Sequence, residues 1–348
     1  MANALEVKLK NKKIDWTKVV ACTDIHVGLK NNSREHNINC ENFIKWFIEQ
    51  ARANNCKTGV FLGDFHHIRA SINISTLNYS VSILRMLNDY FDDFFFLVGN
   101  HDLYYRDKFE IHSLPYIKEF PNIHAVEEIT TIGDYTFVPW LVADEWKKVG
   151  KNKSPYMFGH FELPRFKMNA QVEMPDHGQL NTDHFANQQM VFSGHFHKRQ
   201  NQNKIWYIGN CFPHNFSDAG DDDRGMMIWT PGSNPQFQAW PGAPKYRNLL
   251  LSDVLSDPML YVDQHTYARI TVDVDLTFEE TNFIKELLTQ ELGAREITMV
   301  PTKIGEISFD DSAELNFESV DTIVISHIQS IDSNTIDNQE LIDIYNRI

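Results

Sequence analysis

Cysteine is scarce in this sequence, and its few copies are widely spaced. The four cysteines, Cys22, Cys40, Cys56 and Cys211, form no CxxC pair. The spacing therefore indicates neither a disulfide framework nor a thiolate zinc site. We expect all four to be reduced residues that serve as small hydrophobic groups in a core.

Long apolar runs are also absent. The longest obvious ones, such as residues 94–98, fall far short of the roughly 20 residues that cross a bilayer. Residues 1–13 carry charges where a secretory signal would be continuously apolar. We therefore expect a cytoplasmic protein with no membrane partner. Because 42% of the 348 residues are hydrophobic, the chain can still bury a sizeable core.

Positive charge is scarce in the last part of the chain. The net charge is −15, and residues 251–348 hold 5 Lys and Arg against 20 Asp and Glu. An acidic segment repels phosphate backbones, so a nucleic-acid substrate would need bound metal ions, local basic groups or a partner protein for its attraction. A well-solvated acidic surface is an equally good interpretation.

Short apolar runs alternate with amphipathic stretches through the first two-thirds of the chain, which predicts a layered α/β core. The predicted buried strands are residues 18–23, 58–62, 94–98, 156–158, 190–193 and 205–208. Phe43, Trp46 and Phe47 fall at helical spacing between the first two strands, and residues 75–87 repeat this pattern. We interpret both stretches as crossover helices with a core-facing stripe.

A Pro/Gly cluster at residues 241–244 interrupts this alternation and predicts a domain boundary. The predicted domains are 1–242, a small α+β capping domain at 243–330, and a C-terminal helix at 331–348 that could dock a partner or pack on its own domain. The small domain should contain strands at 267–274, 297–300, 304–309 and 322–325. A capping box of Thr277 and Glu280 should open a helix that ends near Gly293.

Five polar clusters follow the predicted strands. They are Asp24-Ile25-His26, Gly63-Asp64, Gly99-Asn100-His101-Asp102, Gly159-His160 and Gly194-His195-Phe196-His197. Carboxylate, imidazole and amide groups suit divalent metal ions, and the carboxyl ends of strands meet at one edge of a sheet. Alternate side chains of extended backbone share a face, so each i, i+2 pair could present two ligands. One such cluster is usually structural, but five in order predict a metal site.

In this order the clusters resemble those of the calcineurin-like metallophosphoesterase superfamily. Within it the chain is most similar to the SbcD-type recombination nucleases, a group that has phage members. The features that suggest this branch are Asp64-Phe65-His66-His67, Tyr207-Ile208-Gly209 and the acidic run before Arg224-Gly225. The resemblance covers residues 19–229 and implies a β-sandwich flanked by helices.

The resemblance also implies roles for individual residues. It assigns one metal ion to Asp24, His26, Asp64 and His197, and a second to Asp64, Asn100, His160 and His195. Manganese is the favoured metal. His101 would be the general acid or transition-state stabiliser, with Asp102 orienting it, and His67 would contact the substrate phosphate. The role of His66 stays open.

The function implied is a manganese-dependent DNA exonuclease or endonuclease that acts in break repair or recombination. Its expected partners are DNA, an SMC-like ATPase of the SbcC type and a second copy of the chain. One alternative is a phosphatase or cyclic-nucleotide phosphodiesterase with the same chemistry. Another is a catalytically silent scaffold.

A few further residues have two interpretations. Lys198 and Arg199 could meet a DNA phosphate or could be an ordinary surface pair. Residues 221–223 are three consecutive aspartates, for which we expect a solvated turn. Among the histidines outside the clusters, His214 alone draws attention, because it lies near a strand end at the predicted site.

Overall fold

The computed structural model describes residues 3–168, 172–301, 338–339 and 342. Residues 1–301 form one compact unit. The predicted strands 304–309 and 322–325 lie outside the described residues, as does all but three residues of the predicted helix 331–348. No described helix is long and apolar enough to cross a membrane.

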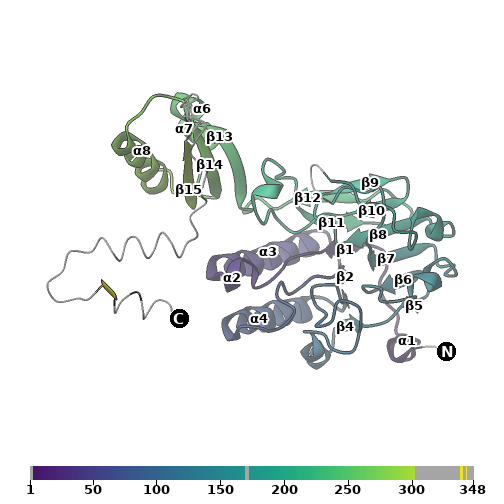
Figure 1. The fold of residues 1–348 in the computed structure, drawn as a ribbon. Helices are drawn as coiled ribbons and strands as arrows, with labels where there is room; N and C mark the ends of the chain where they lie inside the picture. The colour runs from purple at the N-terminus through teal and green to yellow at the C-terminus, as the bar shows by residue number, and fades with distance from the viewer. Residues whose placement is uncertain (1–2, 169–171, 302–337, 340–341, 343–348) are drawn as a thin grey trace. The chain divides into compact units, whose positions relative to one another are not determined.

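Two six-stranded mixed sheets form the main body (Figure 1). The first has the order β12-β11-β1-β2-β3-β4, with bounds Gln236–Ala239, Gly225–Trp229, Val19–Cys22, Thr58–Phe61, Asp93–Leu97 and Ile123–Val126. The second has the order β5-β6-β7-β8-β10-β9, with bounds Thr130–Ile132, Tyr135–Val138, Tyr156–His160, Met190–Gly194, Ile205–Tyr207 and Gln200–Gln202. Strands β1 to β4 run parallel, and so do β6, β7, β8 and β10.

One hydrophobic core lies between the two sheets. Val19 and Ala21 of β1 contribute to it, as do Phe137, Phe158 and Phe192 of the second sheet. The alternate residues of β1 point to the opposite face, where they join a second core with helix residues. Both faces of β1 are therefore buried, which explains its continuous apolar run.

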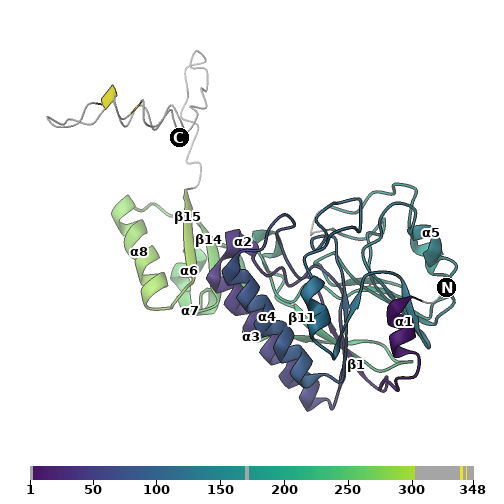
Figure 2. The ribbon, with the colours of Figure 1, turned by 90° about the horizontal axis from the view of Figure 1, so that it is seen from below.

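Helices α3 (Arg34–Ala53) and α4 (Ile74–Tyr90) cover the outer face of the first sheet (Figure 2). Phe43 and Phe47 of α3 are fully buried there, so the aromatic stripe is core as predicted. The predicted α/β class, with a β-sandwich flanked by helices, is confirmed. The remaining described helices of this part are short. They are α1 (Ala4–Leu9), α2 (Leu29–Asn32), α5 (Trp146–Val149) and the 3-10 helices η1 (Pro115–Glu119), η2 (Thr182–Phe185) and η3 (Phe216–Asp218).

A separate three-stranded parallel sheet follows, in the order β13-β14-β15. Its elements are β13 (Lys245–Leu250), α6 (Leu251–Ser256), α7 (Pro258–Tyr261), β14 (Thr266–Val272), α8 (Phe278–Gln290) and β15 (Glu296–Pro301). The capping box of Thr277 and Glu280 opens α8 as predicted. These elements share a small core of their own around Ile270 and Leu288. The predicted boundary at residue 242 stays a prediction.

Candidate metal centre

The five polar clusters meet at one edge of the sandwich, where strands of both sheets end. Backbone hydrogen bonds join the loops that follow β1 and β2, among them those from Asp24 N to the Gly63 oxygen (3.0 Å) and from His26 N to the Asp64 oxygen (3.2 Å). From the second sheet, His160 ends β7, and His195 directly follows β8. Side chains up to 173 positions apart in the sequence therefore lie together.

Several of these residues have unusual backbone conformations. The φ angles are 52° at Asp24, 50° at His26, 60° at Asp64 and 86° at His195. Such values are uncommon for residues with a side chain, and each costs on the order of 1–3 kcal/mol, which the surrounding structure must offset. The expectation that extended backbone aligns the i, i+2 pairs was therefore wrong. Tight reversals of the chain aim these side chains instead.

The first half of the cluster contains two facing imidazoles. The Nε2 atoms of His26 and His197 lie 3.3 Å apart. Asp64 Oδ2 lies 3.8 Å from His26 Nε2, and Asp24 Oδ1 lies 3.9 Å from His197 Nε2. Asp24 is fully buried, yet its Oδ1 has no hydrogen-bond partner among the described residues. A buried carboxylate oxygen without a donor, beside imidazole nitrogens, fits a divalent cation.

The second half is centred on the amide of Asn100. Its Oδ1 lies 2.9 Å from His160 Nε2 and 3.0 Å from His195 Nδ1. Asp64 Oδ1 lies 3.5 Å from His160 Nε2. Asp64 thus turns one carboxylate oxygen toward each half, which is the arrangement that a bridging ligand requires. The donor set of both halves fits divalent ions.

Neighbouring groups hold these side chains in place. Thr23 Oγ1 and the His195 backbone N–H both donate to Asp24 Oδ2, at 2.6 and 3.0 Å. His160 Nδ1 lies 2.6 Å from the Leu62 carbonyl oxygen, which fixes the proton on that nitrogen and directs Nε2 into the cluster.

The electrostatics follow from burial and close packing. Burial opposes ionisation of Asp64, but the His160 ring outweighs it and holds the pKa of the carboxyl well below its usual range. Burial likewise opposes charging of His160, yet Asp64 raises the pKa of that ring to about 9. Burial lowers the pKa of His26 well below its ordinary value, so its ring is neutral, as a metal ligand must be.

The rings of His101 and His67 stack beside the first half, with centroids 5.4 Å apart. The predicted role of Asp102 needs correction. His101 Nδ1 lies 2.8 Å from the His67 carbonyl oxygen, so that backbone group orients the His101 ring. The Asp102 carboxylate instead accepts hydrogen bonds from the backbone N–H groups of Asp64, Phe65, His66 and Gly99. It ties two ligand-bearing loops together.

The structure also gives His66 a role. Its side chain is buried, with Nδ1 2.8 Å from Ser113 Oγ and Nε2 3.0 Å from Ser80 Oγ. Tyr116 Oη lies 3.2 Å from the same Nε2. His66 is therefore a hydrogen-bonded core residue behind the ligand loop.

The basic and acidic residues near the site are largely engaged with one another. Arg199 pairs with Asp223 at 2.7 Å and lies over the Phe237 ring, so it does not offer a free cation for DNA. Asp221 pairs with Arg224, and Asp222 with Arg247. The three carboxylates are 33%, 41% and 73% exposed, so residues 221–223 are solvated as predicted, and each carboxylate also pairs with an arginine.

Sequence reasoning missed two residues beside the second half. Glu162 Oε1 lies 3.9 Å from His195 Nε2, and the Trp140 ring lies 5.0 Å from the His195 ring. Both line a pocket that also contains Trp146 and Met174. Glu162 follows His160 at the same i, i+2 spacing as the ligand pairs, and that signal could have drawn attention to it.

The sequence is similar to several known proteins. A family model described as calcineurin-like phosphoesterase matches residues 17–199, which is 183 of the 348 residues. Exonuclease subunit 1 of Enterobacteria phage T4 is 23% identical over 342 residues, covering 95% of this chain and 98% of that protein. The seven predicted metal ligands all lie inside the matched range.

Two solved structures show more distant similarity. The Pseudomonas putida nuclease MPE is 17% identical, with a TM-score of 0.29 over 51% of this chain and 61% of that one, slightly under two thirds of its length. A dimetal phosphatase from Danio rerio is 11% identical, with a TM-score of 0.40 over 62% of this chain and 93% of that one.

Proposed function

Because this chain belongs to the calcineurin-like phosphoesterase family, we propose that it is a two-metal nuclease that hydrolyses phosphodiester bonds in DNA. The observation that carries the proposal is the convergence of six candidate ligand groups around a seventh, Asp64, whose two oxygens face the two halves of the cluster. The exonuclease subunit of phage T4, similar over nearly the whole chain, supports a nuclease over other phosphoesterases.

Each half of the cluster would hold one divalent ion. Asp24, His26, Asp64 and His197 would form one site, and Asp64, Asn100, His160 and His195 the other. Mixed carboxylate, amide and imidazole ligands without a thiolate favour manganese. When bound, such a pair of ions supplies an activated water and offsets the negative charge that develops on the phosphate.

His101 and His67 would act on the substrate directly. The leaving oxygen of a cleaved phosphodiester needs a proton, and imidazole can supply one near neutral pH. The His67 carbonyl holds the Nδ1 side of the His101 ring, which leaves Nε2 for the substrate. Burial lowers the pKa of His67, and the neighbouring His101 lowers it further. The neutral His67 ring would therefore bind a phosphate oxygen by hydrogen bonding.

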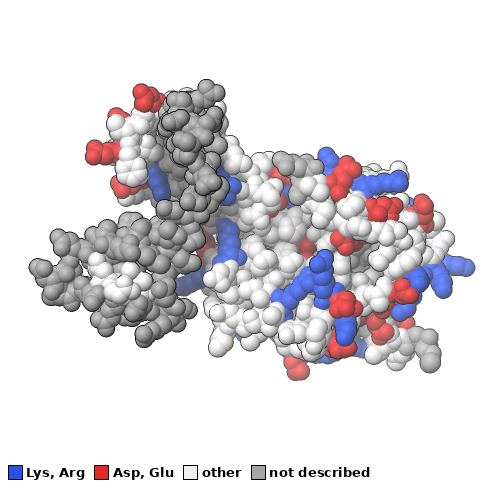
Figure 3. All heavy atoms as spheres, in the orientation of Figure 1, with Lys and Arg blue, Asp and Glu red and all other residues white. Residues whose placement is uncertain are grey.

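A partner protein would supply much of the attraction for DNA. On the face that Figure 3 shows, Lys and Arg side chains alternate with Asp and Glu over the described part. We propose an SMC-like ATPase of the SbcC type as that partner, a homodimer of this chain, and a role in DNA break repair or recombination in the cytoplasm. The phage T4 relative is a subunit of an exonuclease, which agrees with a multi-protein enzyme.

The proposal is tested by incubating the full chain with manganese on linear duplex and single-stranded DNA, with and without the ATPase. Release of nucleotides or fragments is expected. An Asp64→Asn variant should release none. A protein that leaves DNA intact under all conditions but hydrolyses a phosphomonoester or a cyclic nucleotide would overturn the nuclease proposal in favour of a phosphatase or cyclic-nucleotide phosphodiesterase. A protein that binds no metal would indicate a scaffold.

Replacement of His101 tests the proposed proton donor. His101→Gln should lower kcat for DNA cleavage about 10²- to 10⁴-fold, because general acid catalysis typically contributes that much. Its metal content, measured by elemental analysis, should stay at two ions per chain, since His101 is not among the proposed ligands. The matched control is His265→Gln, in the loop between α7 and β14, and this variant should cleave DNA normally. Undiminished cleavage by His101→Gln would exclude His101 from the chemistry.

A further inference from the structure

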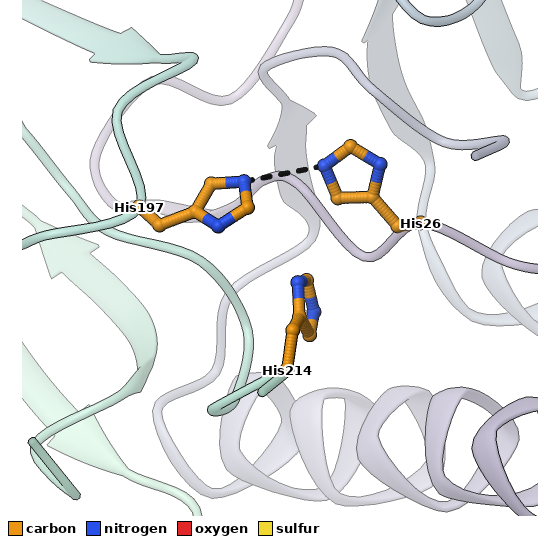
Figure 4. Close-up of side chains that lie close together, drawn as sticks. All are labelled: His26, His197 and His214. Carbon is orange, nitrogen blue, oxygen red and sulfur yellow. Dashed lines mark hydrogen bonds between the residues drawn. The ribbon is translucent and has the colours of Figure 1, made fainter. Parts of the chain in front are cut away.

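A third imidazole lies beside the first half of the metal cluster. His214 is 2% exposed, and its ring centroid lies 5.2 Å from that of His197 and 5.4 Å from that of His26. Figure 4 shows the three rings gathered around one space, each from a different segment of the chain. The candidate ligand atoms of the three histidines all lie within 4.8 Å of one another.

Neither ring nitrogen of His214 has a hydrogen-bond partner among the described residues. Burying a polar group without a partner costs on the order of 1–3 kcal/mol, and this ring carries two such atoms. The aromatic neighbours behind it do not satisfy them. They are Phe212, an apolar ring, and His36, whose Nε2 already lies 2.9 Å from the His26 carbonyl oxygen.

The backbone around His214 holds the ring against the cluster. The His214 N–H donates to Asp218 Oδ2 at 2.9 Å, and the Asn210 N–H donates to the His197 carbonyl oxygen at 3.1 Å. Gly209 has a φ of 80°, and a Cβ built on it would lie 3.0 Å from the His197 carbonyl oxygen. Glycine therefore allows the two segments to approach closely here. The segment that carries His214 is thus tied directly to the segment that carries His197.

The distances suit one shared ion. Metal–imidazole bonds are about 2.1 Å, so two ligands of one ion lie about 3.0 Å apart at right angles and about 4.2 Å apart on opposite sides. The 3.3 Å between the Nε2 atoms of His26 and His197 matches the first arrangement. The ligand atoms of the three histidines lie within 4.8 Å of one another. Side-chain shifts of a few tenths of an ångström would therefore bring all three to bonding distance from one ion.

We propose that His214 is an additional ligand of the ion held by Asp24, His26, Asp64 and His197. This inference rests on the proposed two-metal centre and makes its two sites unlike. One site then has three imidazoles, whereas the other has two imidazoles, an amide oxygen and a shared carboxylate. Imidazole-rich sets favour iron, cobalt or zinc over manganese, so the His214 site prefers a later transition metal and the Asn100 site takes manganese more readily.

The experiment uses the metal-free full chain and Co²⁺ as a spectroscopic probe. Wild-type protein should bind two Co²⁺ ions with unequal affinity, followed by visible absorption and elemental analysis. His214→Phe, which fills the same space without a donor atom, should weaken the tighter site at least tenfold and change its absorption spectrum. Mn²⁺ affinity should change much less. His184→Gln, a half-buried histidine away from the cluster, should match wild type.

Each contrary result has a distinct meaning. Two Co²⁺ ions bound with unchanged affinity and spectrum in both His214→Phe and His214→Gln would overturn the role of His214 and leave the two-metal centre intact. A wild-type chain that binds no Co²⁺ would overturn the centre and this inference together. X-ray absorption on wild type with one equivalent of Zn²⁺ needs no variant: three imidazoles around the zinc support the proposal, and two overturn it.

Discussion

At the scale of single residues, the carboxylate of Asp102 joins the two loops that carry the candidate ligands Asp64 and Asn100. It is fully buried and accepts backbone N–H groups from the loop after β2 and the loop after β3. Burial and the nearby Asp64 charge raise its pKa to about 6, against the effect of these donors. Asp102 therefore fixes the position of the Asp64 backbone.

Replacing this acceptor should destabilise the protein. Asp102→Asn keeps the volume but turns an amide N–H₂ toward backbone donors, leaving some of them unpaired. A loss of roughly 2–4 kcal/mol in the free energy of unfolding is expected, because buried hydrogen bonds to a charged group are worth about 1.5–3 kcal/mol each. Urea unfolding of the metal-free chain measures it. Asp107→Asn, an exposed aspartate on the same loop, should cost almost nothing, and equal losses in the two variants would contradict the proposed clamp.

The sequence predicted the candidate ligands but not the interactions that hold them. The spacing of the Asp, Asn and His clusters was enough to pick seven side chains that do converge. It could not reveal which backbone N–H groups donate to Asp102, or that both ring nitrogens of His214 lack a hydrogen-bond partner in the described part of the chain, because those facts depend on side-chain direction. Nor could it reveal positive φ at Asp24 and Asp64, since neither is a glycine. Contacts between the loops impose those conformations.

At the scale of elements, the ends of strands from the two sheets pack too closely for side chains. A Cβ built on Gly194, at the end of β8, would lie 2.2 Å from Thr23 Oγ1 and 2.8 Å from the Leu62 carbonyl oxygen. Gly99, after β3, is equally confined against the Asp64 backbone. Glycine is required at these two positions by close approach, not by backbone conformation: of Gly63, Gly99, Gly159 and Gly194, only Gly63 has a positive φ.

Gly194→Ala should therefore disturb the packing of the two sheets against each other at the proposed metal centre. The added methyl must push away Thr23 or the backbone of Leu62, for which a destabilisation of about 1–3 kcal/mol is expected. Metal affinity should fall as well, because Thr23 positions Asp24. Thermal unfolding and metal titration measure both effects. Gly150→Ala is the matched control, since its nearest neighbour would be at an ordinary 3.4 Å; a Gly194→Ala variant that behaves like it would refute the packing argument.

Elements were predictable where burial left a clear pattern. Strands β1, β2, β3, β7, β8 and β10 appear in the sequence as short apolar runs because they are covered on both faces. The hairpin of β5 and β6 was missed, since its two strands are short and rich in threonine and tyrosine. Strand β11 was missed although it is buried along its whole length, and it pairs antiparallel with β1. Its partner could not be inferred from an apolar run alone.

At the scale of the whole molecule, stability depends on histidines that are buried in neutral form. Burial lowers the pKa of His36 to about 4 and that of His66 to about 3. His36 is held beside the His26 carbonyl, and His66 lies among Ser80, Ser113 and Tyr116. In the unfolded chain both rings titrate near 6.5. Between that pH and the folded values, the unfolded chain binds protons that the folded chain does not.

Acidification should therefore unfold the metal-free protein cooperatively. The contribution of each neutral ring is fully present above about pH 6.5 and is lost as pH falls toward about 4 for His36 and 3 for His66. From pH 7 to pH 5, linkage gives a loss of roughly 2 kcal/mol for each ring. Urea unfolding at several pH values in this window measures the slope, and His66→Gln, which cannot titrate, should reduce the loss by roughly 2 kcal/mol.

The control is His177→Gln, at an exposed histidine, which should leave the slope unchanged. An unchanged slope in His66→Gln would mean that His66 carries a proton in the folded protein, and its hydrogen bonds to the two serines would then need a different assignment of donors.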